Sequence, residues 1–205
     1  MNLELLVSFG LATALLALSP GPDNIYVLVV SLNKGKAKAL ATVSGLISGC
    51  IIHTTLLAFG VSKIIINNDQ LFLTVKVFGA LYLLFLAYKT YTSNEAINLS
   101  HESLTNHSMI AQFVKGFFMN VLNPKVMLFF LAFFPSFLFS QTMSTLLQFY
   151  VLGFIFMAVS FVIFSGIALL AQSIKSFTLS HKGAPIFFKW LQIIVFVGIA
   201  IFILI

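Results

Sequence analysis

Two short polar segments, each containing proline, interrupt long apolar stretches of this chain. The first is Ser19-Pro20-Gly21-Pro22-Asp23-Asn24, and the second is Asn120-Val121-Leu122-Asn123-Pro124-Lys125. Proline lacks an N–H and clashes with the preceding turn, so each segment should break a helix. In a bilayer, broken backbone is tolerated only where protein shields it or where it lines a water-filled cavity. Interrupted segments in corresponding positions of two halves are the pattern that marks a transporter's substrate site.

The composition predicts a membrane protein. Sixty per cent of the residues are hydrophobic and 8% are charged, whereas a soluble domain carries about 25% charged residues. A helical span needs about 20 apolar residues, so the 205 residues are enough for about six spans. We therefore expect an all-α polytopic membrane protein. The expected apolar segments are about 3–32, 39–66, 71–92, 109–139, 144–173 and 186–205.

The chain is expected to form one transmembrane domain, 1–205, built from two halves. A polar segment at 93–108, rich in Ser and Asn, separates a three-helix half at 1–92 from another at 109–205. A shift of 104 residues puts Ser19-Pro20 over Asn123-Pro124, Phe9 over Phe113 and Gly49 over Gly153. Because each half holds an odd number of spans, the second half must insert upside down, as an inverted repeat. The matches are few, and chance is the alternative explanation.

Lysine placement predicts the orientation in the membrane. The net charge of +6 comes from eleven lysines and no arginine. The lysines on one side of the six-span arrangement are Lys34, Lys36, Lys38, Lys89, Lys115, Lys175, Lys182 and Lys189. The positive-inside rule therefore puts both termini outside and the 93–108 linker in the cytoplasm. The lysines lie between spans and make no basic face, so we expect contact with anionic lipid and not with nucleic acid.

The residues beside the prolines predict new helix starts. Ser19 before Pro20, and Asn123 before Pro124, resemble a cap followed by proline at the first helical position. A helix start has free N–H groups and a partial positive charge, which attract a carboxylate. The prolines also free the carbonyls of Leu16, Leu18 and Asn120, which could accept hydrogen bonds from an ammonium group. A zwitterionic amino acid needs both features, whereas the alternative is a pair of simple proline kinks.

Asp23 and Lys125 are the costliest residues to place in a bilayer. Both lie near the middle of a long apolar segment, where a charge costs roughly 2.5–3.5 kcal/mol on insertion scales. Such groups face the bundle interior and usually pair. One interpretation has Asp23 binding a substrate amine and Lys125 a carboxylate; the other has the two neutralising each other. The predicted substrate site comprises Ser19, Gly21, Asp23, Asn24, Asn120, Asn123 and Lys125, with helix breaks at Pro20, Pro22 and Pro124.

The second span carries small residues and a histidine on one face. Gly45, Gly49 and His53 follow one another at four-residue steps, which places them on one side of a helix. Small residues there, and Gly153 in the second half, allow helices to approach closely. Histidine titrates near neutral pH and can relay protons, so His53 is a candidate for proton coupling. The alternative is a histidine whose hydrogen bonds serve only the structure.

No pattern indicates a cofactor, a metal or an enzyme. His101, Glu102 and His107 lie in the linker and lack a convincing metal-ligand spacing. The sequence contains no nucleophile motif, phosphate-binding loop or pair of catalytic carboxylates. We therefore predict a protein that is not an enzyme and needs no cofactor.

The motifs resemble the LysE/RhtB family of bacterial amino-acid exporters. The matching residues are Leu18-Ser19-Pro20-Gly21-Pro22, Ser31-Leu32-Asn33-Lys34-Gly35, Gly45, Gly49, His53, Gly79-Ala80-Leu81-Tyr82-Leu83, Asn120, Asn123-Pro124-Lys125 and Phe133-Phe134-Pro135. The resemblance covers nearly the whole chain in family order. It implies a six-span inner-membrane protein that exports amino acids or close derivatives, driven by the proton gradient. Ala87, where the family often has glycine, and the segment before Gly198, which lacks the family's early glycine, depart from the pattern.

Two other classes of protein remain as alternatives. An ion or metal transporter of similar architecture would respond to metal and not to amino-acid load. A membrane protein without a transport function, such as an embedded enzyme or assembly factor, would need a chemical site that the sequence lacks. The sequence leaves open which amino acid is exported and whether the chain forms a homo-oligomer.

Overall fold

A computed structural model describes residues 2–61, 69–92, 108–181 and 183–204, and in these ranges the chain forms helices and no strand. The α-helices are α1 (Leu3–Leu18), α2 (Pro22–Lys34), α3 (Lys36–Leu56), α5 (Asp69–Thr92), α6 (Met109–Val121), α7 (Pro124–Phe133), α8 (Thr145–Leu169), α9 (Ala171–Ser180) and α10 (Ala184–Leu204). A π-helical turn, η1 (Leu57–Val61), extends α3, and a 3-10 turn, η2 (Phe134–Phe137), extends α7. The predicted all-α membrane fold is confirmed.

The two proline segments break two spans as expected. α3, α5, α8 and α10 are each long and apolar enough to cross a membrane, which gives four unbroken spans among the described residues. α1 and α2 meet at an angle of 59°, and α6 and the α7–η2 segment meet at 50°. Each bent pair is apolar enough to count as one broken span, which brings the total to six. The breaks fall at the predicted prolines, and this prediction is confirmed.

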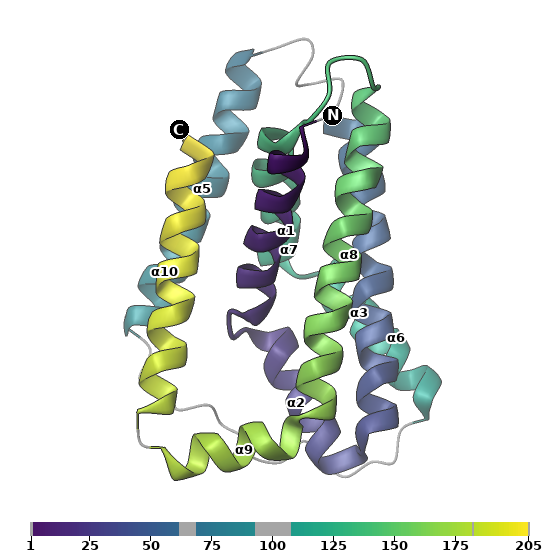
Figure 1. Ribbon diagram of the computed structural model, residues 1–205, viewed down its shortest axis with the longest axis vertical. Coiled ribbons are helices and arrows are strands. Elements are labelled where there is room, and N and C mark those ends of the chain that lie inside the picture. Colours follow the sequence, from purple (N-terminus) through teal and green to yellow (C-terminus); the bar gives the residue numbers. More distant parts are fainter. Residues whose placement is uncertain (1, 62–68, 93–107, 182, 205) are drawn as a thin grey trace.

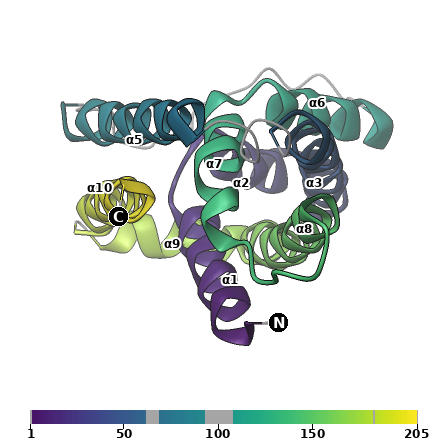
Figure 2. The same cartoon turned by 90° about the horizontal axis from the view of Figure 1, so that it is seen from above.

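Corresponding spans of the two halves run in opposite directions. α1 begins and α10 ends toward the upper end of the molecule in Figure 1, which we call the terminal face. The broken span α1–α2 runs away from this face, and the broken span α6–α7 runs toward it (Figure 1). Figure 2 shows α5 and α10 as a pair beside the group formed by the other spans. This arrangement fits an inverted repeat, but the 93–107 part of the linker lies outside the described residues, so the division at 93–108 stays a prediction.

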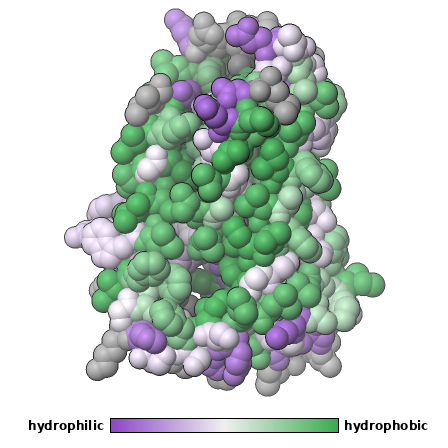
Figure 3. All heavy atoms as spheres, viewed as in Figure 1, coloured by the Kyte–Doolittle hydropathy of each residue, from purple (hydrophilic) through white to green (hydrophobic). Residues whose placement is uncertain are grey.

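The opposite end of the bundle carries most of the lysines, and we call it the lysine-rich face. Helix α9 lies across this face (Figure 1), an element that the sequence patterns did not predict. The lysines of the helix ends and of α9 at this face are Lys34, Lys36, Lys38, Lys89, Lys115, Lys175 and Lys189. Figure 3 shows hydrophilic residues at both ends of the molecule and mostly apolar residues between them. The surface is that of a protein embedded in a bilayer with its charged ends in water.

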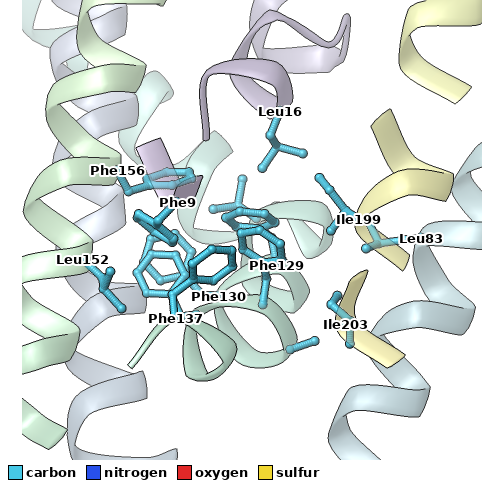
Figure 4. Close-up of a cluster of buried hydrophobic side chains, with 14 of the residues drawn as sticks. Phe9, Leu16, Leu83, Phe129, Phe130, Phe137, Leu152, Phe156, Ile199 and Ile203 are labelled. Atoms are coloured by element: carbon cyan, nitrogen blue, oxygen red, sulfur yellow. The ribbon is translucent and has the colours of Figure 1, made fainter. Parts of the chain in front are cut away.

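Phenylalanine rings fill the core between the breaks and the terminal face. The phenylalanine cluster comprises Phe9 of α1, Phe129, Phe130 and Phe133 of α7, Phe134 and Phe137 of η2, and Phe156 of α8. Its rings contact one another, with centroids 4.1 Å apart for Phe130 and Phe134 and 4.9 Å for Phe9 and Phe134. Figure 4 shows rings from α1, α7 and α8 gathered in one group. This cluster fixes α1, α7 and α8 against one another on the terminal side of the breaks.

Glycines allow the closest helix contacts. Gly45 and Gly49 of α3 lie against α6, where a Cβ added to Gly45 would collide with the backbone oxygen of Phe113. A Cβ added to Gly49 would lie 2.8 Å from the side-chain oxygen of Asn120. In the same way, Gly153 of α8 lies against Thr54 of α3. Backbones that approach this closely hold α3, α6 and α8 together in the absence of a strong hydrophobic driving force within lipid.

Candidate functional site

The first break consists of an extended segment between α1 and α2. Ser19 ends α1, since its N–H donates to the carbonyl of Leu15 at 3.0 Å. Helix α2 begins at Pro22, with Gly21 as its extended cap residue. The prediction that Ser19 caps a helix starting at Pro20 was therefore wrong. Pro22 disfavours a helical conformation for the residue before it, so Gly21 cannot continue a helix from Pro20 and α2 starts at the second proline.

No side chain of the described residues caps the start of α2. The first helical hydrogen bond runs from the N–H of Ile25 to the carbonyl of Gly21, at 3.0 Å, so the N–H groups of Asp23 and Asn24 precede the helical pattern. Asn24 turns back across the break and donates from Nδ2 to the carbonyl of Ala17, at 2.7 Å. The hydroxyl of Ser19 is fully buried and has no hydrogen-bond partner among the described residues. This helix start therefore keeps N–H donors available beside a buried hydroxyl.

The second break has its own cap. Asn123 precedes Pro124 at the first position of α7, and Asn123 Oδ1 accepts a hydrogen bond from the N–H of Lys125 at 3.0 Å. This is the arrangement expected for an asparagine cap followed by proline. Asn123 therefore satisfies one of the N–H groups at the start of α7, whereas no such side-chain bond is made at the start of α2 within the described residues. An anion would find more free N–H donors at the start of α2 than at the start of α7.

A hydrogen bond joins the two breaks. Asn123 Nδ2 donates to Asp23 Oδ2 at 2.9 Å, across 100 residues of sequence. Asp23 is 7% exposed, so its carboxylate is held almost entirely inside the bundle. The amide of Asn123 thus caps α7 with its oxygen and holds Asp23 with its nitrogen. The structure brings the two proline segments together at one place.

Lys125 places a positive charge beside the first break. A Cβ added to Gly21 would lie 3.4 Å from Lys125 Nζ, so the ammonium group lies against the backbone of the break. Nζ also lies 4.9 Å from the ring centroid of Phe196 on α10, a distance that suits a cation–π contact. Within the described part of the chain, no ion pair within 4.0 Å joins Lys125 to Asp23. The two opposite charges share the site without binding each other directly.

Asn120 contacts α3 through both its side chain and its backbone carbonyl. His53 Nε2 lies 3.1 Å from the carbonyl oxygen of Asn120, and the N–H of Asn123 donates to the same oxygen at 3.0 Å. A carbonyl can only accept, so Nε2 is the donor of this bond. Cys50 Sγ lies 3.6 Å from Asn120 Oδ1. The Asn120 carbonyl that Pro124 frees thus accepts hydrogen bonds from His53 and from the N–H of Asn123. The expectation that this carbonyl is free to bind an ammonium group was wrong.

A second buried polar group lies toward the lysine-rich face and was not predicted. Tyr26 of α2 donates from its hydroxyl to Gln112 Oε1 of α6 at 2.9 Å, and Thr42 of α3 lies 3.4 Å from the same oxygen. Lys115 Nζ lies 4.2 Å from the ring centroid of Tyr26. The sequence signal for this group was weak, because Gln112 is a single uncharged polar residue near a helix end. Gln112 shares one face of α6 with Gly116 and Asn120, which follow it by four and eight positions.

The chemistry of the joined breaks suits a small zwitterion. Asp23 supplies a negative charge for an ammonium group, while Lys125 and the uncapped start of α2 supply positive charge and N–H donors for a carboxylate.

Among the described residues, no group of three His, Cys, Asp or Glu side chains could hold a metal ion; His101, Glu102 and His107 lie outside these residues. In the space-filling view a small hollow opens at the height of the α1–α2 break (Figure 3).

Comparison with known proteins identifies relatives along most of the chain. The LysE type translocator family matches residues 14–205. The homoserine/homoserine lactone efflux protein of Salmonella typhimurium is 33% identical over 182 residues, covering 89% of this chain and 87% of the relative. The leucine efflux protein of Enterobacter sp. is 30% identical over 156 residues, covering 74% of each chain. No solved structure matches the chain. This protein therefore belongs to the LysE type translocator family.

Proposed function

We propose that this protein exports amino acids or close derivatives from the cytoplasm across a bacterial inner membrane. Membership of a translocator family makes it a transporter and not an enzyme. The names of its relatives, which export homoserine, homoserine lactone and leucine, support an amino-acid substrate. The single observation that carries the proposal is the meeting of the two breaks, where Asn123 binds Asp23 at 2.9 Å and Lys125 lies beside Gly21.

In the proposed binding mode, the two ends of the amino acid occupy different breaks. Its ammonium group binds the carboxylate of Asp23, where it competes with the amide of Asn123 for the same oxygen. Its carboxylate binds the N–H groups at the uncapped start of α2, together with the ammonium group of Lys125. The occupied cap of α7 favours this orientation over the reverse one, because Asn123 Oδ1 already binds the N–H of Lys125 and leaves fewer N–H donors there for the carboxylate.

Alternating access then requires that one side of the site opens at a time. The phenylalanine cluster closes the route from the site toward the terminal face. Toward the lysine-rich face, a second apolar cluster around Val27, Val43 and Phe164, with the Tyr26–Gln112 hydrogen bond, closes the other route. We propose that transport, driven by protons, opens these two barriers in turn as the two halves rock about the breaks.

An efflux assay tests the proposed function directly. Cells that express the protein are loaded with dipeptides, which are hydrolysed inside, and the excreted amino acids are identified. We expect one or a few amino acids to leave faster than from cells with an empty vector. Faster efflux of metal ions with unchanged amino-acid efflux would instead support an ion or metal transporter.

The orientation can be tested with two single cysteines. We expect Gln141→Cys, in the exposed connection between η2 and α8 at the terminal face, to react with an impermeant thiol reagent added to intact cells. Ser103→Cys in the linker should react only after the cells are opened, because the lysine distribution puts the linker in the cytoplasm. The native Cys50 is buried and serves as the background. Labelling of Ser103→Cys from outside would reverse the orientation.

We propose His53 as the group that couples export to protons. His53 lies at the α3–α6 contact and bonds the carbonyl freed beside the second break, at 3.1 Å, so a change in its charge acts directly on that break. His53→Ala should remove the pH dependence of export while the protein still inserts in normal amounts. His53→Gln is the matched control, because its amide can still donate to Asn120 but cannot titrate. If proton binding by His53 couples export, this variant should also lose the pH dependence. If both variants keep the wild-type pH dependence, His53 has a structural role alone.

A further inference from the structure

Three buried hydroxyl groups near the breaks have no hydrogen-bond partner in the described part of the chain. They belong to Thr13, Ser19 and Ser160, which are 0%, 0% and 1% exposed. Many other serines and threonines within the described helices behave differently: for example, Ser44, Ser48 and Thr54 each donate to the carbonyl four residues earlier. Buried hydroxyls are normally bonded, so those that are not point to a role in binding.

These hydroxyls lie between the phenylalanine cluster and the breaks. Phe9 of α1 and Phe156 of α8 both contact the ring of Phe134, at centroid distances of 4.9 and 5.9 Å. Thr13 and Ser160 each follow one of these phenylalanines by four residues, one helical turn on the same face. α1 and α8 both run away from the terminal face (Figure 1). Thr13 and Ser160 therefore lie in the layer directly below the rings, on the side toward the breaks.

The charged part of the site reaches the same layer. α7 runs in the opposite direction, toward the terminal face (Figure 1), and its Lys125 precedes Phe129 by one turn. Phe129 contacts Phe156, with ring centroids 5.6 Å apart, so Lys125 and Ser160 each stand one turn below rings that touch. Ser19 belongs to the first break itself. Two further hydroxyls without partners, Ser136 and Ser165, are on half-buried residues outside this layer.

We propose that Thr13, Ser19 and Ser160 form a subsite that hydrogen-bonds the side chain of the transported amino acid. This inference rests on the proposed function, in which Asp23 and Lys125 hold the two charged ends. The side chain then points toward the phenylalanine cluster and meets three hydroxyls before it reaches the rings. The subsite selects a short side chain that carries a hydroxyl or another hydrogen-bonding group, and it disfavours an aliphatic side chain of the same size.

The physical basis of this selectivity is the state of the hydroxyls when an aliphatic side chain is bound. A hydroxyl-bearing substrate satisfies them, whereas an aliphatic one leaves them buried and unbonded. Sites built to hydrogen-bond a substrate group reject the analogue without it far more strongly than apolar pockets distinguish a methylene. The phenylalanine cluster limits the length of the substrate side chain, because its rings are buried and packed against one another.

The test compares two substrates of equal shape in the full-length protein. Cells are loaded with dipeptides of homoserine or of norvaline, which differ by a hydroxyl in place of a methyl group, and the ratio of the two export rates is measured. We expect wild type to prefer homoserine. Thr13→Val and Ser160→Ala should each shift the ratio toward norvaline by about tenfold. Ser44→Ala, which removes a hydroxyl already bonded to its own helix at 3.0 Å, is the matched control and should leave the ratio unchanged.

The outcomes separate the subsite from the proposed function. An unchanged ratio in both Thr13→Val and Ser160→Ala, with normal amounts of protein in the membrane, overturns the subsite. Equal export of both amino acids by wild type, or a preference for norvaline, also overturns it while leaving the amino-acid export function intact. If wild type exports no amino acid in the broader dipeptide assay, the proposed function fails first. Two variants are used so that misfolding of one still leaves a result.

Discussion

Replacing Asp23 by Asn should reduce export about a hundredfold while membrane insertion stays normal. The amide keeps the shape of the side chain, and its oxygen can still accept the 2.9 Å hydrogen bond from Asn123, so the link between the two breaks is preserved. The change removes the negative charge that is proposed to bind the substrate's ammonium group. Truncating one partner of a buried charge pair costs about 2–5 kcal/mol, which corresponds to the expected loss. Export in the dipeptide assay and the amount of protein in the membrane are measured together.

Lys125→Met is the complementary change, with the same expected loss. Methionine keeps much of the apolar stem, and the backbone N–H at this position still donates to Asn123 Oδ1, so the cap of α7 survives. The double variant distinguishes the two interpretations of the charges. If Asp23 and Lys125 only neutralise each other, removing both should restore export; if they bind the substrate, the double variant stays inactive. Wild-type export by either single variant would show that the substrate is held elsewhere in the bundle.

Much of the fold follows from the sequence because the strongest physical constraints are local. Apolar length predicts the spans, and proline cannot remain inside a helix without breaking its hydrogen bonds. The predicted segments 71–92 and 109–139 accordingly agree closely with α5 and with the broken span from α6 to η2. Helix α9 was missed because it is short and mostly polar, lies across the end of the bundle, and has no long apolar run.

The details of the breaks could not be predicted, since they depend on partners far away in sequence. The start of α2 was misplaced by two residues because Pro20 and Pro22 compete, and only the three-dimensional path shows which one begins the helix. The hydrogen bond from His53 to the Asn120 carbonyl depends on the contact of α3 with α6. The two residues are 67 positions apart in sequence. Sequence patterns indicated which polar residues lie at the two breaks, but which of them bond to one another depends on the packing of the helices.

The packing explains why the two breaks have different chemistry despite similar sequences. Asn123 has a side chain long enough to cap α7 and reach Asp23 at the same time. At the first break the corresponding residue in the shifted sequence is Ser19, whose shorter side chain remains unbonded at the end of α1. The start of α7 therefore has a side-chain cap, and the start of α2 has none among the described residues. An asymmetric site of this kind can bind a zwitterion in one orientation.

Gly45→Ala should lower the amount of folded protein several-fold. The added Cβ would collide with the carbonyl oxygen of Phe113 and lie 2.9 Å from the nitrogen of Phe117. Both are backbone atoms of α6, which cannot rotate away as a side chain can, so α3 and α6 must separate. Overpacking of this kind costs about 1–3 kcal/mol. Protein level in the membrane and thermal stability in detergent are the measurements.

Gly166→Ala is the matched control for this prediction, because a Cβ there meets no atom within 4 Å. Alanine favours a helix interior over glycine by roughly 0.5–1 kcal/mol, so this variant should be as stable as wild type or more stable. The same chemical change thus has opposite expected signs at the two positions. If Gly45→Ala proves as abundant and as stable as Gly166→Ala, close approach of α3 and α6 is not required. The hydrogen bond from His53 to Asn120, which spans that contact, would then have to form at a greater helix separation.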